Sequence, residues 1–319
     1  MKKFDVLVVG ELNVDLIFNK INPLPEVGKE ALAEQMTLSL GSSSAIFASN
    51  LSSLGSKVGF IGKIGKDHFG EFVLQSLNSK GVDTSLIKQN QALQTGATVV
   101  LNFGEDRAMI THPGAMSYLS IKDIQPEQLA QAHHLHFSSF FLQSGIQQEV
   151  QQLFKQAKSL GLSTSFDTQW DPLEKWDVKL SDILPFVDVF LPNETEFLHL
   201  TGKNDLTEAI DSVKAFSNSI VVKQGNNGSI CWSKGKILYQ EPFLNREVVD
   251  TIGAGDSFNA GFIYKFIQNS DIEACQEYAN LIGAISTTAA GGTSAFADRN
   301  QFTRIAKEKF GYQTHETAR

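Results

Sequence analysis

The sequence predicts one α/β domain with a mostly parallel central sheet and a small additional β-sheet. Short β-branched runs that end near glycine alternate with longer segments of helical periodicity. Two further stretches, about 12–40 and 94–111, contain strand patterns without a clear helix. The 319 residues, 42% of them apolar, can form one large core, so we treat residues 1–319 as a single domain.

The elements follow from these patterns in chain order. Short β-branched runs predict buried strands of the main sheet at 6–9 and 58–61. Strand-like segments between the helices predict four more, at 135–138, 163–167, 187–191 and 220–223. Apolar residues at helical spacing predict helices over 69–77, 146–160, 206–216, 258–266 and 274–290. Helices between strands imply right-handed crossovers and parallel pairing. The remaining strand-like pieces, 14–18, 97–103 and 108–111, predict a small separate sheet, which is typical of a lid.

Charge and composition argue against several classes of protein. The formal net charge is -8 and no run of Lys or Arg occurs, so we expect no nucleic-acid partner. No stretch of 18 apolar residues is present, and the first ten residues resemble a strand more than a signal peptide, so we expect no membrane association. The two cysteines, Cys231 and Cys275, cannot form a disulfide framework, which favours a reducing cytoplasm.

The most informative segment is residues 250–261, which read DTIGAGDSFNAG. Its Gly-Ala-Gly turn leads into an apolar helical pattern, so backbone N–H groups converge at a helix N-terminus and form an anion site. Asp256 follows this turn, where a carboxylate suits either a helix cap or a base beside an anion hole. The residues alone leave both roles open.

This segment resembles the C-terminal signature of the ribokinase-like, PfkB-type family of carbohydrate kinases, Asp-Thr-x-Gly-Ala-Gly-Asp-x-Phe-x-Ala-Gly, at every fixed position. The resemblance implies a three-layer α/β/α ribokinase-like fold and an ATP-dependent kinase. It also implies that Asp256 is the general base. The groups that would stabilise the transferring phosphoryl are the N–H groups of Gly253, Ala254 and Gly255.

Further motifs of the family follow in order along the chain. GELNVD at 10–15 and GSSSA at 41–45 resemble its substrate-binding blocks and imply that Asp15, Gly41 and Ser42 orient the acceptor. NETE at 193–196 is similar to the family's Asn-x-x-Glu motif, which implies that Glu196 holds Mg²⁺ through water. Spacing alone is equally consistent with a solvated acid in the first turn of a helix.

The resemblance also implies where nucleotide and cations bind. The positions similar to the family's nucleotide site are Asn193, Lys223, Gly225, Gly228 and Asn280. Asn280 lies inside a helical run, so a solvent-facing position is the alternative. Many relatives bind a monovalent cation through backbone carbonyls, and for K⁺ the corresponding residues are Asp250, Ile252, Ser286, Ala289 and Gly291.

Departures from the family pattern bear on the acceptor. An Asn of ribose-specific members is replaced by Ile46, which cannot hydrogen-bond a hydroxyl. Residues 42–54 contain no cation for a substrate phosphate, and no Arg follows Asp167 where members that bind acidic sugars have one. We therefore expect a neutral sugar or polyol as the acceptor.

Two alternatives to this function stay open. A nucleoside is the second candidate acceptor, because a base can stack on aromatic rings, although we expect most of the candidate rings to be core: Phe103, Phe137, Phe140 and Phe141. A sugar- or nucleotide-sensing protein without activity is the alternative from another class, but a sensor has no need of a base at Asp256.

Two other features bear on assembly and on metal binding. If the lid strands present open edges, two lids can pair in a homodimer. His134 and His136 share one face of a strand, but no third ligand follows at a fitting spacing, so we expect no metal site there.

Overall fold

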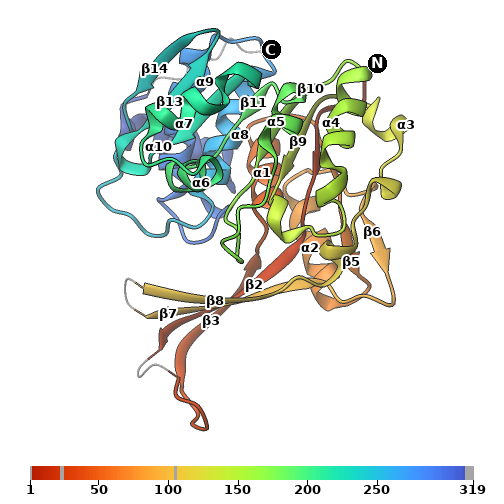
Figure 1. Ribbon diagram of the computed structural model, residues 1–319. Helices are drawn as coiled ribbons and strands as arrows, with labels where there is room; N and C mark the ends of the chain where they lie inside the picture. Colours follow the sequence, from red (N-terminus) through yellow and green to blue (C-terminus); the bar gives the residue numbers. More distant parts are fainter. Residues whose placement is uncertain (1, 22–24, 104–105, 313–319) are drawn as a thin grey trace.

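A computed structural model, which describes residues 2–21, 25–103 and 106–312, shows a main sheet of eight strands in the order β14-β13-β12-β11-β10-β9-β1-β4 (Figure 1). Neighbouring strands from β12 to β4 are parallel, and β13 and β14 extend β12 as an antiparallel meander. The strands are β1 (Phe4–Val9), β4 (Val58–Ile61), β9 (Ala132–Ser138), β10 (Ser163–Asp167), β11 (Val189–Phe190), β12 (Ser219–Lys223), β13 (Ser229–Ser233) and β14 (Lys236–Gln240).

Helices cover both faces of this sheet. One face packs against α3 (Pro126–Leu129), α4 (Val150–Ser159), α5 (Leu180–Ile183), α6 (Glu194–Thr201) and α7 (Leu206–Val213). The other packs against α1 (Ser43–Ser53), α2 (His68–Ser79), α8 (Ala254–Phe266) and α9 (Ile272–Ser286), with α10 (Arg299–Phe310) outside α9. Alternate residues of β1 serve the two faces, as for a strand buried on both sides. The three layers and the mostly parallel sheet confirm the predicted fold class.

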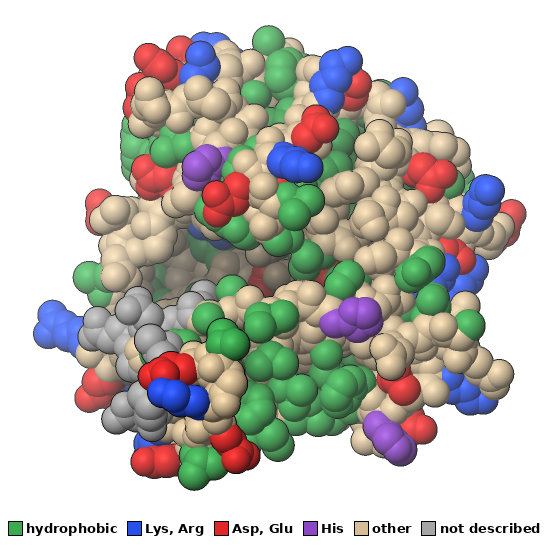
Figure 2. Space-filling model, turned by 60° about the horizontal axis from the view of Figure 1, so that its bottom comes forward, with side chains coloured by type: hydrophobic (Ala, Val, Ile, Leu, Met, Phe, Trp, Pro, Cys, Tyr) green, Lys and Arg blue, Asp and Glu red, His purple; other side chains and the backbone are tan. Residues whose placement is uncertain are grey.

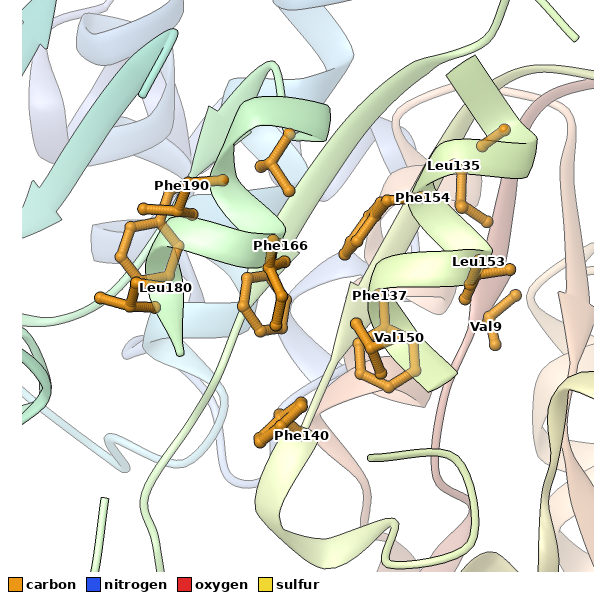
Figure 3. Packing of buried hydrophobic residues seen from close by; sticks show 14 of the residues in the cluster. Val9, Leu135, Phe137, Phe140, Val150, Leu153, Phe154, Phe166, Leu180 and Phe190 are labelled. Carbon is orange, nitrogen blue, oxygen red and sulfur yellow. The ribbon is translucent and has the colours of Figure 1, made fainter. Parts of the chain in front are cut away.

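Phenylalanine rings form the centre of the core beneath α4. Phe166 on β10 is fully buried, and its ring centroid lies 5.7 Å from that of Phe154 and 5.7 Å from that of Phe190 (Figure 3). Phe137 and Phe140 pack against the same ring at 6.1 and 5.9 Å. These contacts anchor the carboxyl end of β10, where the strand leads into the cleft described below.

A second sheet with the order β3-β2-β7-β8 projects beneath the main one (Figure 1). Its strands are β2 (Asn13–Ile21), β3 (Ala33–Leu40), β7 (Gly96–Phe103) and β8 (Asp106–His112), which come from the two stretches where the sequence shows strands without a helix. Because β1 ends only a few residues before β2 begins, the second sheet lies at the carboxyl edge of the main sheet. A small pair, β5 (Lys63–Gly65) and β6 (Lys88–Asn90), completes the strands of the described residues.

Some helices differ from expectation. Helix α1 was not predicted, because it is buried on most sides and its serines hide any apolar stripe: Ser44, Ser49 and Asn50 are as buried as Phe47. Helix α10 was not predicted either, and α4 begins at Val150 after a 3₁₀ turn. No helix in the described part of the chain is both long and apolar enough to cross a membrane.

The helix predicted over 274–290 ends earlier, at Ser286. The chain beyond it turns back toward residues 249–252. The Thr287 carbonyl accepts the N–H of Val249 at 2.9 Å, and the Asp250 carboxylate accepts the N–H of Gly291 at 2.8 Å. These bonds replace the last helical turn that the sequence pattern suggests.

We expect Phe166→Ala to lower the free energy of unfolding by about 3–5 kcal/mol, because it opens a cavity among several rings that cannot collapse into it. Leu244→Ala, at a site 57% exposed, should change it by less than about 0.5 kcal/mol. Urea unfolding of both variants measures the difference. Equal effects would contradict the central role of this cluster.

Candidate active site

A cleft of about 860 Å³ lies between the second sheet and the carboxyl edge of the main sheet. Figure 2 shows it as a hollow between the upper and lower parts of the molecule. Ligands of open parallel sheets bind at this edge. Residues 251–256 line the cleft together with residues from β2, β7, β12 and the starts of α1, α6 and α8.

The turn before α8 has the predicted shape of an anion site. Gly253 caps the helix in a left-handed conformation (φ 73°), and a Cβ atom there would lie 2.7 Å from Gly292 Cα. Only glycine fits this close approach without a shift. The N–H of Ala254 donates to the Thr251 carbonyl at 3.2 Å, whereas the N–H of Gly255 is open to a ligand.

Asp256 lies in the first turn of α8, with its side chain in the cleft although the residue is only 7% exposed. Its Oδ1 accepts a hydrogen bond from Gln169 Nε2 at 3.0 Å. Burial, reinforced by the nearby charge of Asp167, raises the pKa of Asp256 to about 7, although Lys223 opposes this shift. A carboxylate with such a pKa can accept a proton near neutral pH.

A buried ion pair lies next to Asp256. Lys223 Nζ, at the end of β12, is 2.7 Å from Asp167 Oδ2, at the end of β10. The same carboxylate oxygen accepts Asn259 Nδ2 at 2.5 Å and Gln169 Nε2 at 3.0 Å. Burial alone lowers the pKa of Lys223, but Asp167 and Glu196 outweigh it and raise the pKa overall. The lysine is therefore charged, and much of its charge is balanced within the protein.

The Asn193–Glu196 pair begins α6 as a capping box. Asn193 Oδ1 accepts the Glu196 N–H at 2.8 Å, and Glu196 Oε2 accepts the Asn193 N–H at 3.0 Å. Glu196 is 4% exposed, so it is not the solvated acid that spacing alone allowed. Burial and then Asp167 raise its pKa to about 7. Both residues line the cleft.

The predicted acceptor residues meet where β2 and β3 join the main domain. Burial raises the pKa of Asp15 to about 6, against the hydrogen bonds of Asn13 and Thr98. Gly41 lies directly behind Asp15, because a Cβ atom at Gly41 would come within 2.3 Å of Asp15 Oδ1. Ser42 caps α1 and donates its hydroxyl to the Glu11 carbonyl at 2.7 Å. Asp15 and Ser42 line the cleft, whereas Gly41 supports Asp15 from behind.

The predicted nucleotide residues line the other part of the cleft, together with Phe243 and Ala284. Gly225 and Gly228 have positive φ, 56° and 81°, in the turn between β12 and β13. Asn280 does not face bulk solvent: it is 7% exposed, and its amide donates to Ser229 Oγ at 2.8 Å.

The residues predicted for a monovalent cation lie on two segments that the structure joins. Asp250 accepts the N–H groups of Ile252 (2.9 Å) and Gly291 (2.8 Å) through its two carboxylate oxygens. Ser286 is the last residue of α9, close in sequence to Gly291. Ala289 packs against the apolar residues between α9 and α10. The backbone carbonyls proposed as ligands therefore belong to neighbouring chain segments.

Other sequence candidates have structural roles. Phe137 and Phe140 belong to the core, as expected, and Phe141 packs against Trp176 at 5.6 Å. Ile46 is 3% exposed and packs beneath Gly253 and Gly292, and it also lines the cleft. His134 and His136 are buried and share the Ser165 hydroxyl, each at 2.7 Å. Within the described residues no three His, Cys, Asp or Glu side chains form a metal site.

Comparison with known protein families matches residues 3–299 to the pfkB family carbohydrate kinases. The chain belongs to this family. Among curated relatives, the 5-dehydro-2-deoxygluconokinase of Lacticaseibacillus casei is 27% identical and the deoxyribokinase of Salmonella typhi 28% identical. The matches cover 99% and 93% of this chain and 99% and 97% of the relatives. The activity is therefore that of a sugar kinase.

Solved PfkB-type structures share the fold. The structure of Arabidopsis thaliana ribokinase complexed with ribose and ATP superposes with a TM-score of 0.83 at 24% identity. The match covers 95% of this chain and 99% of that one. The ribokinase-like fold predicted from the sequence is thus confirmed.

Sequence reasoning missed several residues of this PfkB-family cleft. Asp167, Gln169, Asn259 and Glu11 are all in the polar network around Asp256, yet none was predicted as a site residue. Asp167 is the last residue of β10 and Glu11 follows the apolar strand β1, and an acid at the carboxyl end of a parallel strand is a usable signal. Asn259 and Gln169 have no such signal, because folding alone brings them together.

We expect Asp256→Asn to stabilise this kinase without ligands. The pKa of Asp256 is about 7 when folded and near 3.9 in the unfolded chain, so ionisation disfavours the folded state increasingly from pH ~4 to ~7. The unfolding temperature should rise by several degrees at pH 8, since 1 kcal/mol shifts it by roughly 2–4 °C. The gain should shrink toward pH 4 and vanish below pH ~3, where the carboxyl is neutral in both states.

Thermal unfolding at a series of pH values measures this effect. Glu308→Gln, which changes one carboxylate of an exposed pair with Arg304, is the control and should leave the unfolding temperature unchanged. A lower unfolding temperature for Asp256→Asn at pH 8 would show that the carboxylate stabilises the fold.

Proposed function

We propose that this sugar kinase transfers the γ-phosphoryl group of Mg-ATP to a hydroxyl of a small neutral sugar or polyol, with Asp256 as general base. The observation that carries the proposal is the buried Asp256 carboxylate in the cleft, one residue after the open N–H of Gly255. A base and an anion site in adjacent positions suit the attack of a hydroxyl on a phosphoryl group.

In this mechanism, the acceptor hydroxyl lies between Asp256 and the γ-phosphoryl group. Asp256 takes the hydroxyl proton as the oxygen bonds to phosphorus, and the bond to the ADP oxygen breaks. The N–H of Gly255 stabilises the charge on the phosphoryl oxygens, and the N–H groups of Gly253 and Ala254 join it once Ala254 releases the Thr251 carbonyl. Asp15 and Ser42 orient the acceptor, and the second sheet acts as a lid that excludes water.

The nucleotide is proposed to lie along the β12–β13 turn and α9. Supporting residues are Asn193, Lys223, Gly225, Gly228 and Asn280, all of which line that part of the cleft. Relatives of known structure include a ribokinase with bound ATP. Lys223 acts here through its buried positive charge, since its Nζ is bonded to Asp167.

The cleft fits a magnesium ion that takes most of its ligands from phosphate and water. The buried acids there outnumber the buried cations, because one cation, Lys223, faces three acids: Asp167, Glu196 and Asp256. No set of three described side chains forms a cage, which agrees with the preference of Mg²⁺ for waters and substrate phosphates. Glu196 would hold it through water, and the ion would neutralise phosphate charge.

A K⁺ ion would lie on the carbonyls of Asp250, Ile252, Ser286, Ala289 and Gly291.

A neutral acceptor fits the cleft better than an acidic one. Lys223 is the one basic side chain among the described residues that line the cleft, and Asp167 neutralises it. Asp15 and Asp256 add negative charge where the acceptor binds. Trp170, 43% exposed, presents a ring that can pack on the apolar face of a sugar. An acceptor with a carboxylate or phosphate finds no free cation there.

ADP release with Mg-ATP and a panel of sugars, polyols, sugar acids and nucleosides tests the proposal. We expect activity with a neutral sugar or polyol, and a loss of at least about a hundredfold in kcat for Asp256→Asn with ATP binding retained. Preference for a sugar acid would contradict the neutral acceptor, and preference for a nucleoside would favour the other candidate. Binding without any turnover would favour a sensor.

We also propose that two copies pair through their lids. Asp15, Val100 and Met109 line the cleft, so alternate residues of the same sheet face outward. On all four strands of this sheet the residues of this outer face include apolar side chains. They are Leu16, Phe18, Met36, Leu38, Val99, Leu101 and Ile110. Met36 is 62% and Ile110 68% exposed, and Figure 2 shows hydrophobic side chains gathered over this region. A second copy offers the same apolar face as partner.

Light scattering after size exclusion tests this dimer. We expect wild type to elute as a dimer and Ile110→Glu as a monomer, because a carboxylate would be buried in the interface. Gln35 is next to Met36 in β3, and its side chain lies on the opposite face of the sheet, so Gln35→Glu should remain dimeric. A monomeric wild type at tens of micromolar would contradict the proposal.

The proposed location is the cytoplasm. Cys231 and Cys275 are both free and buried, and burial raises the pKa of each thiol to about 12. Free thiols of this kind agree with a reducing compartment.

A further inference from the structure

Gln169 touches both buried carboxylates at the end of β10. Its Nε2 lies 3.0 Å from Asp256 Oδ1 and 3.0 Å from Asp167 Oδ2. Its backbone N–H donates to Asp167 Oδ1 at 3.1 Å. The residue lines the cleft, and it follows a strand whose core packing fixes the position of the chain. One amide therefore connects the proposed base to the Asp167–Lys223 ion pair.

We propose that Gln169 is a positioning residue for Asp256, and that its amide fixes Oδ1 so that Oδ2 receives the proton of the acceptor hydroxyl. This inference rests on the proposed role of Asp256 as base. An amide nitrogen carries two hydrogens, so it can serve two carboxylates at once. It also adds no charge, whereas a lysine would favour the ionised carboxylate more strongly and make it a weaker base.

The backbone supports this role. Gln169 has a left-handed conformation (φ 58°), which is unfavourable for a residue with a Cβ atom and natural for glycine. The surrounding chain holds this geometry, because the buried Asp171 carboxylate accepts the N–H groups of Leu173, Lys175 and Trp176. A strained residue in a well-fixed loop is typical of a site where the side chain matters.

Removal of the amide should change how Asp256 titrates. The charged groups that act on Asp256 are Asp167 and Glu11, which raise its pKa, and Lys223, which lowers it. A hydrogen bond donated to a carboxylate favours the ionised form. Loss of the Gln169 amide therefore raises the pKa of Asp256, and activity that needs the ionised base should fall off at a higher pH than in the wild type.

Three variants test the proposal. Gln169→Leu and Gln169→Gly both remove the amide, and Gly also relieves the backbone strain. We expect each to lower kcat by about tenfold to a hundredfold, with the KM for ATP within about twofold of wild type and the acid limb of the kcat profile moved to higher pH. Gln169→Glu keeps the shape but places a third acid beside two others, so its loss and its shift should be larger.

Gln151→Leu is the matched control, because its amide donates to the Asp182 carbonyl outside the cleft at 2.8 Å. It should leave kcat and the pH profile unchanged. Gln169→Gly should unfold within a few degrees of wild type, which separates a loss of activity from a loss of folding.

The outcomes separate this inference from the proposed function. If Gln169→Leu and Gln169→Glu keep the wild-type kcat and the wild-type acid limb while Asp256→Asn is inactive, the role of Gln169 alone is overturned. A change confined to the KM for the acceptor would also overturn it, since it would make Gln169 a binding residue. Turnover by Asp256→Asn at the wild-type rate would overturn the base itself.

Discussion

The cleft depends on the buried ion pair between Asp167 and Lys223. These residues end β10 and β12, two strands separated in the sheet by β11, and their side chains meet at 2.7 Å. Removal of either partner would leave a buried charge unpaired, at a cost of about 3–5 kcal/mol. Asn259 of α8 and Gln169 of the following loop bind the same Asp167 oxygen. The pair thus fixes the sheet edge, the helix that carries Asp256 and the loop beside it relative to one another.

The acids of the cleft outnumber its cations, and this supports the proposal that cations bind there together with the substrates. The pKa values of Asp15, Glu196 and Asp256 are all raised, to about 6, 7 and 7, with burial as the largest cause in each case. Each ionised carboxylate makes the folded state less stable than a neutral side chain would. Active sites commonly lower the stability of the folded protein in this way. In the proposed function, a metal ion bound with the nucleotide would offset this negative charge.

Local features of the site could be predicted from the sequence, and assembled ones could not. The turn at 253–255, Asp256 and the Asn193–Glu196 capping box lie within short segments whose spacing sets their geometry. The six parallel strands of the main sheet were predicted, most of them because burial on both faces leaves apolar runs, whereas β13 and β14 were not. Gln169 and Asn259 were not predicted, because their role depends on contacts with Asp167 that form only on folding. Asn259 lies 92 positions after Asp167 in the sequence. Helix α1 was missed because a helix buried on most sides has no polar face to reveal its period.

The two sheets divide the cleft between them. Asp15, Val100 and Met109 come from the second sheet, whereas Lys223, Gly228 and Asn280 come from the main sheet and the helices on it. If the acceptor and the nucleotide bind as proposed, substitutions in β2 and β7 alter which acceptor fits while the residues proposed to bind the phosphoryl donor stay intact. An arrangement of this kind would let a lineage acquire new sugars by changes in two strands of the second sheet, without changes to the main sheet and its helices.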